Sequence, residues 1–526
     1  MTTAMADAKG TILWVDDEIE LLRPHIRFLT EKGYVVRTAT NGEDAVALVR
    51  AEAYDLVFLD EMMTGMGGLK TLAEIKEIRP ALPVVMITKN EEESLMEDAI
   101  GDKISDYLTK PVNPSQVLLA CKKILEGRKI AGEAASRDYI QEFNAITVAL
   151  MNEPDHGQWV EIYQRLTGWG LEFDRHAELG LKQTLLDQIR ECNLAFGKYV
   201  ERHYRDWMES ERGRPALSHE VVDRWVIPEL QTGKSVVFFV IDCLRLDQWL
   251  MMEELLHEHF TVTRQHYYSI LPTATPYSRN AIFSGSYPSD LELRHPELWE
   301  KSEDDESSRN RYEKQFLDKL LERRKVSLRP DAKYVKIIDT EYGRGVEQNI
   351  LSYTQNRLTA IVVNFVDMLA HGRSDSSLLK EIAPDESAYR LLTRSWFVHS
   401  SLFGMLKTLA RQKNVTVLLT TDHGSIRSLR GSKVLGDREA STNLRYKFGR
   451  NLKAEEKAAI IVKDPREFKL PRRGVAANYI IAKEDYYFVY PTDYHRYLAQ
   501  YRDSFQHGGV SMEEVILPVV KLEPRG

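Results

Sequence analysis

Short apolar runs alternate with amphipathic stretches over the first 126 residues of the chain. The runs are TILWV, YVVRTA, YDLVFL, LPVVMI and SDYLT, at intervals that suit strand–helix units. Five such units predict an α/β fold with a doubly wound parallel sheet, which we place at residues 1–127.

From residue 128 to about residue 220 the pattern changes to helical spacing. YIQEFNAITVALM and WVEIYQRLTGW repeat apolar positions every three or four residues, and no β-like run interrupts them. The stretch NEPDHG and the glycines Gly168 and Gly170 are typical of turns. We therefore predict a helical-bundle linker at 128–220 that connects and spaces its neighbours.

Alternating α/β patterning returns at Lys234 and continues to the end, which places a third domain at 221–526. SVVFFVI, AIVVNFV and VTVLLTT are continuous apolar runs, typical of parallel strands that are buried on both faces. The polar stretch Lys301–Asn310 predicts a surface loop.

Composition and charge exclude several classes of protein. A net charge of −8 argues against general coating of nucleic acid, and three cysteines are too few for a disulfide framework. The N-terminus has no apolar signal region, and no stretch approaches 18 apolar residues. We therefore expect a cytoplasmic protein.

Polar residues follow the predicted strands of the first domain. Asp16 and Asp17 follow the first strand, Asp60 ends the third, Thr88 ends the fourth and Lys110 ends the fifth. Because these strand ends meet in one crevice, three carboxylates converge there as hard-oxygen ligands for Mg²⁺. Taken singly, each would be an ordinary strand-end polar residue, and the five together favour a phosphoryl site.

This arrangement resembles the CheY-like receiver domain over about residues 10–126. The resemblance implies that Asp60 is the phosphoacceptor and that a sensor histidine kinase is the partner. It also implies two further sets of residues: the magnesium ligands Asp16, Asp17, Asp60 and the Met62 carbonyl, and the switch residues Thr88, Tyr107 and Lys110. Thr64 stands where the family usually has proline, which we expect to loosen its loop.

The third domain repeats this pattern with different ligands. Three Asp and two His end or closely follow apolar runs, and a third His precedes the run VILPVV. Together they form a mixed nitrogen and oxygen set, which suits a pair of Zn²⁺ or Mn²⁺ ions better than Mg²⁺ alone. Two such ions a few ångströms apart can clamp the oxygens of a phosphoryl displacement. The six residues are Asp242, Asp367, His371, Asp422, His423 and His507.

The segment YYSILPTATPYSRNAIFSG supplies two candidate nucleophiles, Thr273 and Thr275. Pro276 suits the first turn of a helix that ends near Gly285. A hydroxyl at such a helix start meets backbone N–H groups that stabilise phosphoryl oxygens. Arg279, one turn later, is the cationic side chain that we expect to contact substrate.

The motifs VIDCLRLDQW, PTATPYSR, DMLAH, TDHG and QHGG resemble, in order and spacing, the PglZ group of the alkaline phosphatase superfamily, over about residues 234–520. In related nucleotide phosphodiesterases the nucleophilic threonine lies ten residues before a helix-closing glycine. Thr275 and Gly285 reproduce this interval, so the resemblance implies that Thr275 attacks. It also implies one metal on Asp242, Asp422 and His423 and the other on Asp367, His371 and His507. An inactive descendant that only binds metal is the alternative.

A basic stretch bears on the substrate. Eight Lys and Arg residues lie between Arg427 and Lys453, against Asp437 and Glu439. Such a stretch is either a solvated loop or a funnel that guides a polyanion towards the metals.

Receiver, helical linker and PglZ-type domain together resemble response regulators of the type IX secretion system, which implies a role in regulating secretion. The first hypothesis is a metal-dependent phosphodiesterase for nucleotide or oligonucleotide substrates, switched by phosphorylation of Asp60. The second is a metal-stabilised scaffold that recruits a sigma factor. In both, we expect phosphorylation-dependent homodimers, formed through the receiver face at about Glu91–Glu126.

Overall fold

The computed structural model describes residues 9–89, 104–176, 180–299, 310–436, 443–472, 474 and 476–525, with the side chains of 126–134 and 375 left out. The chain forms two compact units, Met1–Gln141 and Glu142–Gly526. The predicted loop at Lys301–Asn310 lies outside the described residues except for Asn310. Within the described part of the chain, no helix combines the length and apolar character needed to cross a bilayer.

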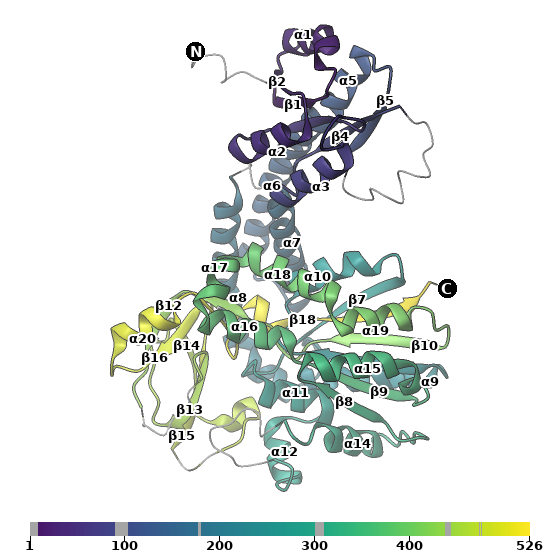
Figure 1. The fold of residues 1–526 in the computed structure, drawn as a ribbon. Coiled ribbons are helices and arrows are strands. Elements are labelled where there is room, and N and C mark those ends of the chain that lie inside the picture. The colour runs from purple at the N-terminus through teal and green to yellow at the C-terminus, as the bar shows by residue number, and fades with distance from the viewer. Residues whose placement is uncertain are drawn as a thin grey trace. The chain divides into compact units, whose positions relative to one another are not determined.

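The first unit contains a parallel sheet of five strands, as the sequence predicted (Figure 1). Its strand order is β2-β1-β3-β4-β5. The central strands β1, β3 and β4 are almost fully buried because their apolar runs face helices on both sides. The strands are β1 (Thr11–Val15), β2 (Val35–Ala39), β3 (Leu56–Asp60), β4 (Val84–Thr88) and β5 (Asp106–Thr109), and the helices include α1 (Arg23–Glu31), α2 (Gly42–Ala51), α3 (Gly68–Ile78) and α5 (Pro114–Cys121).

The region predicted to be a helical linker is helical, and its elements are α6 (Gly127–Met151), α7 (His156–Arg175) and α8 (Lys182–Glu209). NEPDHG turns the chain between α6 and α7, and Asp155 caps α7 by accepting from the N–H groups of Gly157 and Gln158. The predicted turn at Gly168 and Gly170 is wrong, because both glycines lie inside α7. Burial of its apolar face outweighs the low helix propensity of glycine.

The second unit is built on a six-stranded sheet in the order β7-β18-β10-β6-β9-β8. β6, β8, β9 and β10 are parallel, and their alternate side chains pack against α11 and α14 in one large core. The strands are β6 (Ser235–Ile241), β7 (Phe260–Tyr268), β8 (Lys333–Ile337), β9 (Leu358–Val363), β10 (Val415–Thr420) and β18 (Ile516–Pro524). Helices that bear on the site are α10 (Leu246–Glu253), α11 (Thr275–Ser284), α14 (Glu313–Arg323), α16 (Phe365–Asp375), α17 (Ser377–Ile382), α18 (Glu386–His399) and α21 (Met512–Val515).

Two strand assignments differ from the sequence prediction. The run AIVVNFV ends as a strand at Val363, and Phe365 already begins α16. β18 contains most of the run VILPVV and pairs antiparallel to β10, so His507 does not precede a parallel strand. The amino end of an antiparallel strand lies at the same sheet edge as the carboxyl ends of its parallel neighbours. His507, shortly before β18, is therefore still at the edge where the other ligands gather.

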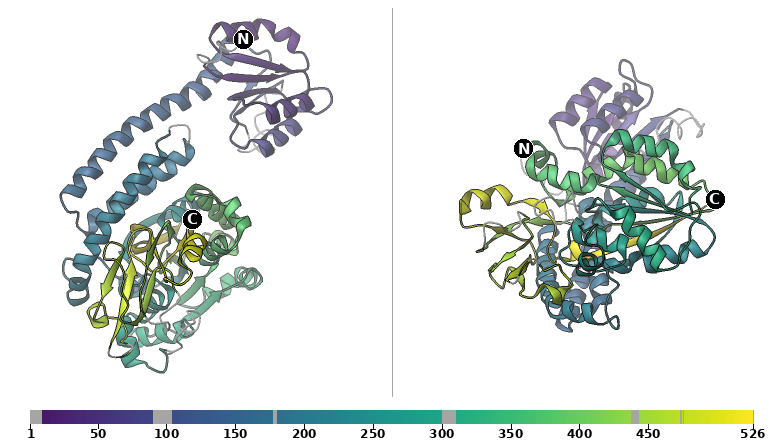
Figure 2. Two further views of the ribbon diagram at one scale, coloured as in Figure 1. Left: turned by 90° about the vertical axis from the view of Figure 1, so that its left-hand side faces the viewer. Right: turned by 90° about the horizontal axis from the view of Figure 1, so that it is seen from below.

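Contrary to the sequence prediction, regular α/β alternation does not continue to the end of the chain. After β10 the chain forms three small sheets, β11–β17, β12–β16 and β13–β15–β14, beside the main sheet (Figures 1 and 2). These strands are β11 (Ile426–Ser428), β12 (Arg430–Lys433), β13 (Tyr446–Arg450), β14 (Ala459–Val462), β15 (Ala477–Ala482), β16 (Tyr486–Val489) and β17 (Ser504–Gln506). His507 directly follows β17.

Candidate metal and phosphoryl sites

The receiver residues meet at the carboxyl edge of their sheet. Oxygen atoms of Asp16, Asp17 and Asp60 lie within 4.8 Å of one another, as a metal site requires. Lys110 Nζ lies 3.0 Å from Asp16 Oδ2 and 2.9 Å from Asp60 Oδ1. Burial raises the pKa of Asp60, and the bond from Lys110 opposes this rise.

The other receiver residues take different positions. Thr88 is buried, and its hydroxyl donates to the carboxylate of Glu61. Tyr107 and the side chain of Met62 are exposed, at 43% and 70%. Much of the face at Glu91–Glu126 falls on residues 91–103, outside the described residues, so the predicted dimer face stays a prediction.

Thr64, which the sequence analysis expected to loosen its loop, is bonded to Asp17. Its backbone N–H and its hydroxyl both donate to Asp17 Oδ2, at 3.1 and 3.0 Å. A proline at this position has neither donor. The backbone bond from Thr64 also lowers the pKa of Asp17.

In the second unit, Asp242, Asp422 and His423 form a buried cluster whose candidate ligand atoms lie within 4.8 Å of one another. Asp242 follows β6, and Asp422 and His423 follow β10, which neighbours β6 in the sheet. His423 Nδ1 lies 3.1 Å from the Gly424 carbonyl, so this nitrogen can donate there and leave Nε2 as the lone-pair atom.

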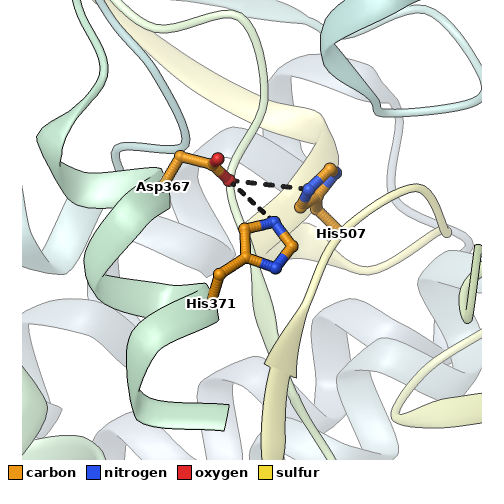
Figure 3. A group of neighbouring side chains, drawn as sticks. All are labelled: Asp367, His371 and His507. Carbon is orange, nitrogen blue, oxygen red and sulfur yellow. Dashed lines mark ion pairs between the residues drawn. The ribbon is translucent and has the colours of Figure 1, made fainter. Parts of the chain in front are cut away.

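Asp367, His371 and His507 form an outer cluster of the same kind (Figure 3). Asp367 and His371 lie one turn apart on α16, and the Asp367 carboxylate points towards both imidazoles. Asp367 Oδ1 is 3.4 Å from His371 Nε2 and 3.6 Å from His507 Nε2. The side chain of His371 is half exposed at 49%, whereas the members of the buried cluster are almost inaccessible.

The electrostatics of the two clusters differ. Burial raises the pKa of Asp242 to about 7, and burial also raises the pKa of Asp422. Burial opposes ionisation of Asp367 as well, yet its contacts with His371 and His507 hold its pKa well below its usual range. The buried cluster thus holds two carboxylates that lack sufficient compensating positive charge.

The arrangement of side chains in the buried cluster suits a bound cation. Asp422 Oδ2 is buried and has no hydrogen-bond donor among the residues that the structure describes. The guanidinium of Arg279 approaches it only to 3.7 Å, through Nη1. Carboxylate oxygens and imidazole nitrogens together suit zinc or manganese.

The structure separates the two candidate threonines. Thr275 begins α11, with Oγ1 3.0 Å from His423 Nε2 and 3.4 Å from Asp242 Oδ1. Thr273 is fully buried, and its hydroxyl accepts from Gly508 N at 3.1 Å and donates to the Gly509 carbonyl at 2.8 Å. Of the two, Thr275 therefore directs its hydroxyl towards the candidate ligand residues.

Arg279 is not placed as a free substrate contact. Its side chain is 2% exposed, with Nη1 2.7 Å from Asp242 Oδ2 and Nε 2.7 Å from Glu313 Oε1. Glu313 also accepts from Asn310 at 2.8 Å and from the Tyr334 hydroxyl. Asn310 in turn donates to the Thr275 carbonyl at 3.2 Å.

Sequence reasoning missed Glu313 and Asn310 as supports of this site. Asn310 lies 35 residues after Thr275, and Glu313 lies 34 residues after Arg279. Both stand in a polar region that contains no motif, and only the packing of α14 against α11 brings them to the site.

Over its described part the basic stretch is partly exposed, at Lys433, Arg450 and Lys453, and partly paired or buried. Arg427 pairs with Asp503, and Arg430 pairs with Glu484 and Asp485. Arg445 is buried against Glu514, at 2.5 Å. The remaining residues include Lys447, buried with its pKa lowered to about 7 by burial, and Asp437, Arg438 and Glu439, which lie outside the described residues.

Comparison with known proteins shows to which family the chain belongs. The sequence-family model described as "BREX system PglZ alkaline phosphatase-like domain" matches residues 221–522, more than half of the chain. The chain belongs to the PglZ family. The PglZ domain is preceded by matches to the response regulator receiver domain at 12–122 and to the PorX response regulator linker domain at 129–208. This PglZ protein therefore has the domain architecture of PorX-like response regulators.

Curated relatives match about a quarter of the chain. The alginate biosynthesis transcriptional regulatory protein AlgB of Pseudomonas putida is 38% identical over 125 residues, 24% of this chain and 28% of that protein. The transcriptional regulatory protein ResD of Bacillus subtilis is 35% identical, over 22% of this chain and 47% of that protein. The chain thus spans less than half the length of either relative.

Solved structures match a similar share of the chain. Chemotaxis protein CheY4 of Vibrio cholerae is 27% identical, with a TM-score of 0.21, and the match covers 22% of this chain and 98% of that one. The receiver domain of NtrX from Brucella abortus is 35% identical with a TM-score of 0.21, over 22% of this chain and 98% of that one. A receiver domain implies a sensor kinase as partner, and an alkaline phosphatase-like domain implies metal ions.

Proposed function

We propose that this PglZ protein is a metal-dependent phosphodiesterase, controlled by phosphorylation of Asp60 in its receiver domain. The observation that carries the proposal is the position of the Thr275 hydroxyl, 3.0 Å from His423 and 3.4 Å from Asp242 at the start of α11. A reactive hydroxyl beside metal-ligand side chains is the arrangement that an in-line phosphoryl displacement needs.

The buried cluster would hold one zinc or manganese ion and the outer cluster a second. When bound, the ions would supply Lewis-acid activation of the hydroxyl and compensate charge on the phosphoryl oxygens. In the receiver, Asp16, Asp17 and Asp60, with the Met62 carbonyl, would hold Mg²⁺.

In the proposed reaction, Thr275 and then water are the attacking groups. Thr275 Oγ1 attacks phosphorus, and the bond from phosphorus to one ester oxygen breaks and releases an alcohol. Water then attacks the phosphothreonine, restores the hydroxyl and releases a phosphate monoester. We assign Arg279 to orient Asp242, in place of the expected substrate contact, because Asp242 and Glu313 occupy its guanidinium.

Diesters should be better substrates than monoesters. Arg279, the cationic side chain that the sequence places beside Thr275, is already paired with carboxylates and is not free to neutralise the extra charge of a monoester. We expect kcat/KM for a nitrophenyl nucleotide diester to exceed that for nitrophenyl phosphate by about tenfold, or ~1.4 kcal/mol. Steady-state assays of both substrates on one metal-loaded preparation measure this ratio. A higher value for the monoester contradicts the assignment.

The metal-free protein should become less stable as pH rises from about 5 to about 8. Burial raises the pKa of Asp242 to about 7, so below that pH the folded state holds a proton that the unfolded state has already released. The stability linked to that proton is lost as pH rises to the folded pKa. Thermal unfolding at both pH values should show a drop of several degrees in Tm, and Asp242→Asn should reduce that drop. An equal drop in both proteins rules out Asp242 as its source.

Phosphorylation should strengthen self-association of the chain. In receivers of this kind, the phosphoryl group on Asp60 draws Thr88 inwards, and Tyr107 follows. A change of ~3 kcal/mol shifts a dimerisation constant more than a hundredfold. Sedimentation with and without beryllofluoride measures the shift, and Asp60→Ala is the control. A chain that stays monomeric in both conditions, or one that dimerises equally as Asp60→Ala, excludes this mechanism.

A scaffold that recruits a sigma factor is the second candidate function, and the domain architecture of PorX-like regulators favours a role in type IX secretion for both. The occupied guanidinium of Arg279 is the observation that favours weak turnover. Metal-dependent hydrolysis of a chromogenic nucleotide diester separates the candidates, since a scaffold binds metal without turnover.

A further inference from the structure

One side chain of the linker reaches the segment that follows His507. Asn193 lies on α8, is 3% exposed, and accepts from the backbone N–H of Met512 at 2.8 Å. Its Nδ2 donates to both carboxylate oxygens of Glu513, at 3.0 and 3.3 Å. A single amide therefore holds both the backbone and a side chain at the start of α21.

The start of α21 adjoins both clusters of ligand residues. Met512 lies five residues after His507 of the outer cluster. On the other side, the N–H of Gly424, which follows His423 of the buried cluster, donates to the Glu514 carbonyl at 3.3 Å. A Cβ at Gly424 would lie 1.9 Å from the Glu513 carbonyl oxygen, so the two backbones are in close contact.

The rest of this loop is held from within the PglZ domain. Glu514 accepts from Gly509 N at 2.8 Å and pairs with buried Arg445, while the Thr273 hydroxyl bonds to Gly508 and Gly509. Asn193 adds the linker's contribution to a loop that is otherwise well fixed.

A second connection runs from the linker towards Asp242. Arg390 on α18 pairs with Asp174 of α7, at 2.5 Å, and with Asp247 of α10, at 3.1 Å. Asp247 also pairs with Arg245, three residues after Asp242. The linker helices are thus connected to chain segments close to candidate ligands of both clusters. One segment is the start of α21, near His507, and the other is the start of α10, near Asp242.

We propose that Asn193 is a positioning residue for the candidate metal ligands, and that the helical linker is therefore part of the metal-binding unit. This inference rests on the proposed function, because it takes the two clusters as metal sites. It gives the linker a task beyond spacing its neighbours. A change that moves α8 relative to α21 would act on His507 through the loop at residues 508–511 and on His423 through Gly424.

The variant Asn193→Asp tests the proposal. It keeps the acceptor for Met512 N–H but places a carboxylate against the carboxylate of Glu513. We expect zinc to bind about tenfold more weakly in titration calorimetry, which corresponds to ~1.4 kcal/mol. In the metal-free protein, backbone amides of residues 507–515 should exchange hydrogen faster.

A second substitution should restore the contact. In Asn193→Asp combined with Glu513→Gln, the amide and the carboxylate exchange places, so one hydrogen bond and the original net charge return. Zinc affinity and hydrogen exchange should move back towards the wild-type values. Such a reversal would trace the effect to the contact between positions 193 and 513 and not to a change elsewhere in α8.

Gln188→Glu is the matched control. Gln188 is also a buried amide on α8, and its Nε2 donates to the Phe143 carbonyl of α6 at 3.1 Å. We expect a lower unfolding temperature with unchanged zinc affinity of the folded protein. Equal losses of affinity in Gln188→Glu and Asn193→Asp would show a general effect of linker stability and overturn the proposal.

Failure of the proposed function is distinguishable from failure of this inference. A wild-type protein that binds no zinc overturns the metal assignment, and hydrogen exchange in the metal-free protein then still measures whether Asn193 holds the His507 loop. A wild-type protein that binds zinc, beside an Asn193→Asp variant of equal affinity and equal exchange, overturns the inference alone.

Discussion

Replacing Thr275 by valine should lower the turnover of a phosphodiester at least ~10³-fold, because the variant keeps the shape of the side chain and removes the attacking oxygen. The loss should appear in kcat. Zinc content and unfolding temperature should stay close to the wild-type values, because the Thr275 hydroxyl bonds to the side chains of Asp242 and His423 and not to the backbone of a loop. Steady-state kinetics with metal analysis of the same preparation measure both effects.

Thr275→Ser is the control, because it retains the hydroxyl and should retain much of the rate. Thr273→Val should act differently, since the Thr273 hydroxyl joins the backbone of Gly508 and Gly509. We expect weaker zinc binding and a lower unfolding temperature from that variant. Wild-type turnover in Thr275→Val would move the nucleophile to another residue.

The second large effect is expected from Asp422→Asn. Asp422 Oδ2 is buried without a hydrogen-bond donor among the described residues, while Oδ1 accepts from the N–H groups of Cys243 and His423. Asparagine keeps the Oδ1 contacts and removes the charge. The metal-free variant should therefore be more stable than the metal-free wild type, because one desolvated carboxylate is gone from the buried cluster.

With zinc the order should reverse. The wild type gains stability from the bound ion, whereas the variant lacks a ligand and should gain little. Hydrolysis should fall with the zinc content, by at least ~10²-fold. Thermal unfolding of both proteins, with and without zinc, gives the four unfolding temperatures that this comparison needs. A variant whose unfolding temperature still rises with zinc as much as that of the wild type would remove Asp422 from the ligand set.

The positions of the candidate ligand residues were predictable because parallel strands end at one edge of a sheet. Asp60, Asp242 and Asp422 each follow or end a strand with a continuous apolar run, and such runs are visible in a single sequence. His507 reaches the same edge by another route, ahead of the antiparallel strand β18. Strand direction depends on pairing between distant segments, which hydrophobic patterning does not encode.

The residues that support the site were less predictable. Glu313 reaches Arg279 only because α14 packs against α11, and the intervening residues contain no motif. Thr64 departs from its family's usual proline, yet its two bonds to Asp17 follow from the loop conformation and not from residue type alone. Gly168 and Gly170 lie within a helix because packing outweighed their local preference.

The compact second unit begins near Glu142, whereas the match to the PglZ family begins at residue 221. Asn193 and Asp174 lie between these two positions, and both bond to residues beyond 221. A fragment cut at residue 221 would keep all six ligand side chains and leave Glu513 and Arg390 without their linker partners. Gene fusions that transfer this PglZ domain to another regulator should therefore carry α7 and α8 with it, and the two parts are expected to evolve together.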